Sequence, residues 1–201
     1  EVLNAKAASD PLGLYAEPMG NDYFGGLFRS GTAGSYAYTP RPGFENKPVV
    51  FVSFFDTLRF ANWVHNGGGS GDTESGAYTL LGGTPIPSNA AAVVRNPEAR
   101  SFLPSEAEWY KAAFFDPSTQ AYFDFPTRSD VPTICTTPDQ DDGNAANCYG
   151  PTTILWQLTD VGAYEHSPGP NGTFDQGGNV WEVNEQRKGV LRGNRGGAWL
   201  G

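Results

Sequence analysis

The strongest local signal in this chain is Leu-Pro-Ser-Glu-Ala-Glu-Trp at residues 103–109. Ser105 and Glu108 have the spacing of a capping box, in which the serine hydroxyl accepts a hydrogen bond from the N–H three residues on and the glutamate carboxylate reaches back. Apolar residues then recur at helical spacing, beginning with Trp109. The pattern predicts a helix that begins after Ser105 and ends before Pro117.

A second helix is predicted upstream of this motif, over residues 53–65. Ser53 is placed as its N-cap, Asp56 falls in the first turn near the positive end of the helix dipole, and Asn66-Gly67 supplies a stop. The other expected elements are short, namely the end of a helix within residues 1–9 and strands at 35–39, 78–81, 93–94 and 101–103. The sequence therefore predicts an α+β fold with two main helices and little other regular structure.

The composition agrees with a loop-rich fold. The sequence has 26 glycines and 16 prolines in 201 residues, about a fifth of the chain, where average usage is roughly 12%. Both residues are the poorest in helix interiors, which argues against a helical bundle or a coiled coil. Aromatic residues make up 13% and charged residues 17% of the chain, which argues against disorder. With no internal repeat and no long polar linker, residues 1–201 are predicted to form a single domain.

The charge balance narrows the classes of partner. Thirteen Lys and Arg residues stand against 22 Asp and Glu, a formal net charge of −9, so we do not expect a surface that follows nucleic-acid phosphates. The basic cluster of Arg187, Lys188, Arg192 and Arg195 is predicted to be a solvated hairpin. No apolar run approaches the roughly 18 residues of a membrane helix. The identity of a protein or glycan partner is left open.

The two cysteines, Cys135 and Cys148, have twelve residues between them. This spacing favours a loop-closing disulfide, with a pair of reduced thiols as the alternative. Two thiols without a CxxC spacing make a poor zinc site. A disulfide, together with few lysines, indicates an oxidising compartment, so we expect a secreted, periplasmic or cell-surface protein.

Two segments are rich in oxygen ligands. The first, residues 139–147, departs from the EF-hand pattern, because Gly143 falls one position early and no glutamate follows where the bidentate ligand belongs. The second, residues 175–182, carries carboxylates at both ends of a glycine turn. Calcium binds carboxylates, amide oxygens and backbone carbonyls. Each segment is therefore either a calcium loop or a solvated turn with an Asx motif.

Several motifs along the chain resemble those of the formylglycine-generating enzyme (sulfatase-modifying factor) family, and they follow one another in the same order. They are residues 48–53 running into 61–63, residues 102–109, Gly-Gly-Asn-Val-Trp-Glu at 177–182, and the segments 190–193 and 196–199. The sequence is most similar to the secreted bacterial branch of that family. The resemblance implies a variant of the C-type-lectin fold with structural calcium.

The metal ligands that the resemblance implies fall into two sets: Asp175, Gly178, Val180 and Glu182 in the first, and Asn147, Cys148, Gly162 and Tyr164 in the second. In the first set the ligands would be the side-chain carboxylates of Asp175 and Glu182 and the backbone carbonyls of Gly178 and Val180. In the second set, relatives with a strong site carry Asp at the position of Gly162. Asp160 lies two residues away from that position.

The activity that the family implies depends on a closely spaced cysteine pair that holds copper, downstream of a Gly-Gly-Ser-Trp-like motif. Here that motif reads Gly-Gly-Ala-Trp at 196–199, and both cysteines lie upstream of Gly177. We expect the domain to be truncated at both ends. The favoured interpretation is a calcium-stabilised, non-catalytic C-type-lectin-like module, an extracytoplasmic binding or structural subunit of a larger assembly. The alternative is a copper-dependent formylglycine-generating oxidase that acts on a protein cysteine and whose catalytic cysteine segment is missing from this chain.

Overall fold

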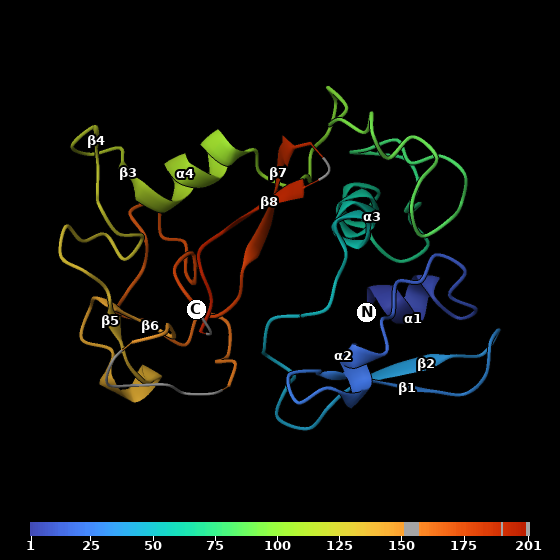
Figure 1. Cartoon of the computed structure of the whole chain (residues 1–201), viewed down its shortest axis with the longest axis horizontal. Helices are drawn as coiled ribbons and strands as arrows, with labels where there is room; N and C mark the ends of the chain where they lie inside the picture. The colour runs from blue at the N-terminus through green and yellow to red at the C-terminus, as the bar shows by residue number, and fades with distance from the viewer. Residues whose placement is uncertain (151–156, 190, 200–201) are drawn as a thin grey trace. The chain divides into compact units, whose positions relative to one another are not determined.

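The computed structural model describes residues 1–150, 157–189 and 191–199 of the chain. They form short helices and two-stranded sheets joined by long irregular segments (Figure 1). The chain packs as two compact units, the first made of Glu1–Glu45 and Val49–Leu103 and the second of Asn46–Pro48 and Pro104–Gly201. The expected α+β architecture with little regular secondary structure is therefore confirmed.

The first unit contains three helices and one antiparallel sheet. The elements are α1 (Val2–Lys6), α2 (Pro18–Asn21), β1 (Leu27–Ser30), β2 (Ala37–Pro40) and α3 (Phe54–His65). In the sheet, Phe28 lies opposite Thr39. The helix expected within residues 1–9 and the strand expected at 35–39 both form, the first shorter than the predicted span and the second shifted by one or two residues.

Helix α3 begins where the sequence predicts. The Ser53 hydroxyl accepts a hydrogen bond from the N–H of Asp56 at 3.2 Å, and the Asp56 carboxylate accepts one from the N–H of Ser53 at 2.8 Å. This reciprocal capping satisfies two of the donors that a helix start leaves free. The buried face of α3 includes Leu58 and Ala61, which pack with Tyr78 in one core cluster.

Asn62 is a fully buried side chain on the same helix. Its amide donates to the carbonyls of Thr73 at 2.8 Å and Tyr78 at 3.0 Å, and its oxygen accepts from the N–H of Tyr78 at 2.7 Å. The strand expected at 78–81 is reduced to a single bridge between Tyr78 and Arg95. The expectation was wrong there because the N–H and carbonyl of Tyr78 also bond to the Asn62 side chain, so no ladder extends beyond the bridge. The strands expected at 93–94 and 101–103 do not form either.

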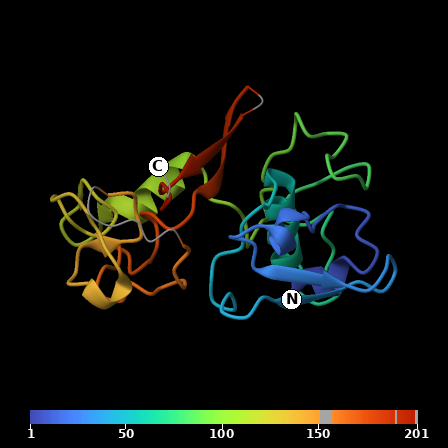
Figure 2. The same cartoon turned by 60° about the horizontal axis from the view of Figure 1, so that its bottom comes forward.

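The described residues of the second unit form the second main helix and three small sheets. Its elements are α4 (Glu106–Phe114), β3 (Phe115–Asp116), β4 (Ala121–Tyr122), β5 (Ile134–Cys135), the 3-10 helix η1 (Pro138–Gln140), β6 (Ala145–Ala146), β7 (Glu182–Lys188) and β8 (Leu191–Arg195). Strands β5 and β6 pair in parallel, whereas β3 with β4 and β7 with β8 pair antiparallel. The β7–β8 pair is the hairpin expected from the basic cluster, and it stands out from the surrounding loops of this unit in Figure 2.

Helix α4 starts with the predicted capping box of Ser105 and Glu108. It ends at Phe114, since the next residue turns into an extended conformation and opens β3. At its first turn, Glu106 accepts a hydrogen bond from the buried amide of Asn184 at 2.7 Å and pairs with Arg195. These contacts attach the first turn of α4 to both strands of the hairpin.

No helix among the described residues has both the length and the apolar character needed to cross a membrane.

Candidate metal centre

The loop between residues 175 and 182 is held in an irregular backbone conformation. Asp175 and Asn179 have positive φ angles of 61° and 58°, and Gly178 has a φ of 85°. A Cβ on Gly178 would stand 2.3 Å from the carbonyl oxygen of Asn147. Only glycine fits at that approach, so the loop and the segment around Asn147 are packed backbone against backbone.

Asp175 opens this loop with a half-buried carboxylate. One oxygen, Oδ2, accepts a hydrogen bond from the N–H of Gly162 at 2.6 Å. Burial raises the pKa of this carboxyl above its ordinary range, and the hydrogen bond from Gly162 offsets part of the rise. This contact joins a residue of the first predicted ligand set to one of the second.

Glu182 closes the loop at the start of β7. Its carboxylate accepts a hydrogen bond from the indole N–H of Trp109 on α4. Burial raises the pKa of Glu182, the bond from Trp109 lowers it, and the negative charge of Asp175 raises it again. Both carboxylates of the loop therefore have raised pKa values, chiefly because they are partly buried.

Neither of these carboxylates has a cationic partner: no Lys or Arg of the described residues forms an ion pair with Asp175 or Glu182. Each accepts one hydrogen bond from the described residues and has a second oxygen that accepts none. Partly buried carboxylates usually gain a compensating charge or a proton. A divalent cation with oxygen ligands would supply that charge.

Asn147 belongs to the second predicted ligand set and is 2% exposed. Its side-chain amide donates to the carbonyl of Gln157 at 3.0 Å, and its backbone carbonyl accepts from the N–H of Asn179 at 2.7 Å. The Asn179 side chain in turn bonds both the N–H and the carbonyl of Thr159, at 3.1 and 3.2 Å. Three segments distant in sequence are thus joined through two buried asparagines.

Cys148, next in the chain, is bonded to Cys135 with a Cα–Cα distance of 4.9 Å. The predicted disulfide is therefore confirmed. The carbonyl of Tyr164, another implied ligand, accepts a hydrogen bond from the N–H of Ser167 at 3.1 Å. Asp160, the alternative acidic residue for this set, pairs with Lys47 at 3.1 Å. The second set therefore has its amide and carbonyl oxygens, but the nearby carboxylate already has a charge partner.

The earlier segment rich in oxygen ligands, residues 139–147, is closed by hydrogen bonds within the protein. Asp141 accepts from the hydroxyl of Ser167 at 2.5 Å and from the N–H of His166 at 2.7 Å. The amide oxygen of Asn144 accepts from the hydroxyl of Thr127 at 2.6 Å. These contacts match the alternative of a turn with Asx motifs.

Across the described residues, no group of three or more His, Cys, Asp and Glu side chains gathers as a metal cluster. A cation at the 175–182 loop would therefore depend on backbone carbonyls beside the two carboxylates. Gly178 and Val180 are the residues of the implied set that would provide them. Calcium accepts such mixed oxygen ligands.

Sequence reasoning missed the contact of Trp109 with Glu182 and the central role of Asn179. Trp109 reads as a core residue of a helix stripe, and it is indeed 4% exposed. Its N–H needs a partner once it is buried, which is the signal that points to a nearby acceptor. Asn179 gave no local signal, because its partners lie about 20 and 32 residues away.

These features define a C-type-lectin-like module in which glycine-rich loops are held by buried amides and carboxylates. A family model described as Sulfatase-modifying factor enzyme 1-like domain matches residues 29–201, and the chain belongs to this family. A solved structure titled "Crystal Structure of CarF" matches with a TM-score of 0.58 and 20% sequence identity, over 94% of this chain and 70% of that one. At that identity the likeness shows the fold alone. No curated protein matches the sequence significantly.

The copper site that the family resemblance implies does not fit the residues present. It requires two cysteine thiolates, and the two cysteines of this sequence are bonded to each other. We therefore derive no step through copper.

Proposed function

We propose that this chain is a calcium-stabilised module of the sulfatase-modifying factor family that serves as an extracytoplasmic binding or structural subunit, without catalytic activity of its own. The observation that carries the proposal is the pair of half-buried carboxylates, Asp175 and Glu182, which have no basic partner within the part of the chain that the structure describes. A bound calcium ion would neutralise both charges. The disulfide supports an oxidising compartment.

Calcium would stabilise the fold by mass action, because the loop that forms the site exists only in the native state. At a calcium concentration of about 100 times the Kd, the expected gain is about 2.7 kcal/mol. For a chain of this size such a gain raises the Tm by about 5–10 °C. The measurement is thermal unfolding of the metal-free protein with and without added calcium.

The key variant is Glu182→Gln, which keeps an oxygen acceptor for the Trp109 N–H but removes the charge. We expect it to lose most of the calcium-dependent rise in Tm. Without metal, it is expected to unfold at or above the temperature of the unmodified chain, since an uncompensated charge has been removed. Glu165→Gln is the matched control, because that glutamate is exposed. A Tm that calcium does not change, or an equal calcium response in both variants, would contradict the proposal.

The absence of oxidase activity is tested separately. The 201-residue chain, mixed with copper and a cysteine-containing peptide, is expected to consume no more oxygen than copper and peptide alone. Both cysteines are already joined, so the chain offers no thiol pair to the metal. Conversion of the peptide cysteine to an aldehyde that depends on the chain would overturn the non-catalytic assignment.

A further inference from the structure

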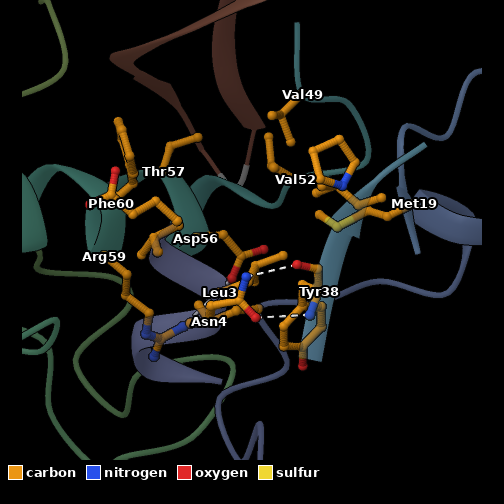
Figure 3. Close-up of a pocket in the computed structure, with 15 residues that line it drawn as sticks. Leu3, Asn4, Met19, Tyr38, Val49, Val52, Asp56, Thr57, Arg59 and Phe60 are labelled. Atoms are coloured by element: carbon orange, nitrogen blue, oxygen red, sulfur yellow. Dashed lines mark hydrogen bonds and ion pairs between the residues drawn. The ribbon is translucent and has the colours of Figure 1, made fainter. Parts of the chain in front are cut away.

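The first unit contains a cavity of about 390 Å³ that the proposed calcium loop does not involve (Figure 3). It lies among α1, α3, β2 and residues 49–52. The side chains that make most of its wall are apolar: Leu3, Leu14, Met19, Val49, Val52 and Phe60. The volume falls in the range of small-molecule sites, which is roughly 300–1,000 Å³.

The wall at residues 49–52 depends on an unusual backbone conformation. Phe51 has a φ of 62°, in the left-handed region that bulky residues rarely occupy. In a straight strand, residues two apart share a face, whereas here Val49 and Val52, three apart, both line the cavity. The turn at Phe51 is what allows this. Backbone strain of this kind is concentrated at functional sites.

Part of the apolar wall is open to solvent. Val49 is 58% exposed, Val52 36% and Phe60 51%. Large apolar side chains gathered at the rim of a concave surface are typical of ligand sites.

Asp56 lies at the centre of the lining side chains in Figure 3. One carboxylate oxygen, Oδ2, accepts the N–H of Ser53 at 2.8 Å, while the other, Oδ1, has Arg59 as its nearest cation at 4.0 Å. The side chain of Asp56 is only 13% exposed. Burial raises the pKa of this carboxyl, the hydrogen bonds with Ser53 and the charge of Arg59 offset part of the rise, and the charge of Asp10 adds to it.

Arg59 is shared between two carboxylates. It lies 4.0 Å from Oδ1 of Asp56, while its Nε donates to Glu74 at 2.6 Å and its two terminal nitrogens donate to the carbonyls of Pro85 at 3.0 Å and Thr84 at 2.8 Å. Because one cation faces two carboxylates, the group of Arg59, Glu74 and Asp56 keeps one net negative charge.

The neutral polar side chains of the lining are already bonded. Asn4 donates to the carbonyl of Tyr38 at 2.7 Å and accepts from its N–H at 2.8 Å, as the dashed lines in Figure 3 show. The hydroxyl of Thr57 donates to the carbonyl of Phe54 at 2.7 Å. Of the two carboxylates in the lining, that of Glu1 is exposed to solvent, so Oδ1 of Asp56 is the largely buried acceptor that a ligand can reach.

We propose that this cavity binds a small apolar molecule that carries an ammonium or similar cationic donor. The cation would contact Oδ1 of Asp56, and the apolar body would lie against Val49, Val52 and Phe60. A cation complements the net negative charge of Arg59, Glu74 and Asp56, and covering the exposed apolar rim is favourable.

The test uses three eight-carbon probes that differ in one group: octylammonium, 1-octanol and octanoate. Binding to the whole chain is measured by isothermal titration calorimetry. We expect octylammonium to bind with a Kd at least about tenfold below that of octanoate. Asp56→Asn keeps an oxygen acceptor for the Ser53 N–H, and it is expected to remove this preference.

Val49→Trp narrows the cavity at an exposed position, and it is expected to weaken the binding of all three probes. Val94→Trp is its matched control, because Val94 is 73% exposed and outside the lining. Thermal unfolding shows whether each variant folds. If Val49→Trp does not fold, the comparison of Asp56→Asn with the unmodified chain decides the test. The proposal is overturned if octylammonium does not bind saturably, if octanoate binds as tightly, or if Asp56→Asn leaves the preference unchanged.

Discussion

The disulfide between Cys135 and Cys148 allows a quantitative prediction from the structure. The bond joins residues 13 apart in sequence. In the chain-entropy description, closing a loop of that length restricts the unfolded chain by about 3 kcal/mol. We therefore expect the double variant Cys135→Ser/Cys148→Ser to lose about 3 kcal/mol of unfolding free energy, which lowers the Tm by about 6–12 °C.

The contacts around the bond indicate that the folded state changes little in this variant. Cys135 pairs with Ala146 in the short parallel sheet of β5 and β6. Asn147, beside Cys148, is held independently by Gln157 and Asn179. The loss is therefore expected to act mainly through the unfolded chain. The calcium-dependent rise in Tm should remain in the variant.

The assay is urea unfolding of the oxidised chain and the double variant, each with and without reductant. Reductant is expected to lower the stability of the unmodified chain to that of the variant, and to leave the variant unchanged. A difference below about 1 kcal/mol would refute the loop-closure reasoning. Loss of the calcium response would show that the bond acts through the folded site instead.

Two further predictions concern buried polar groups. Asn62→Ala leaves the N–H and carbonyl of Tyr78 and the carbonyl of Thr73 without their partner, so urea unfolding should show a loss of about 3 kcal/mol or more. Because burial raises the pKa of Asp175 and Glu182, their contribution to metal-free stability is present below their unfolded pKa values and is lost as pH rises through the folded ones. The Tm of the metal-free chain, relative to Asp175→Asn/Glu182→Gln, should therefore fall as the pH rises above the ordinary carboxyl pKa of about 4, and a constant difference would contradict this.

The parts of the fold that could be predicted from sequence are those encoded within a few residues. The starts of both main helices follow from Ser53 with Asp56 and from Ser105 with Glu108, since each capping box closes over three residues. The basic hairpin and the disulfide could also be predicted, because each joins segments that are close in the sequence. The strand expected at 78–81 does not form, because the backbone N–H of Tyr78 bonds to the side chain of Asn62, which is 16 residues away in the sequence.

The sequence by itself determined the family, the α+β class, the main helices and the positions of the two carboxylates in the 175–182 loop. Only the tertiary structure decided which groups those carboxylates contact. It placed Trp109 against Glu182 and Gly162 against Asp175, and it joined Asn147 to Asn179. It also formed the cavity around Asp56 from segments that no local pattern relates. The physical reason is that caps and turns satisfy neighbouring backbone groups, whereas buried carboxylates and amides take their partners from whichever distant segments packing brings within reach.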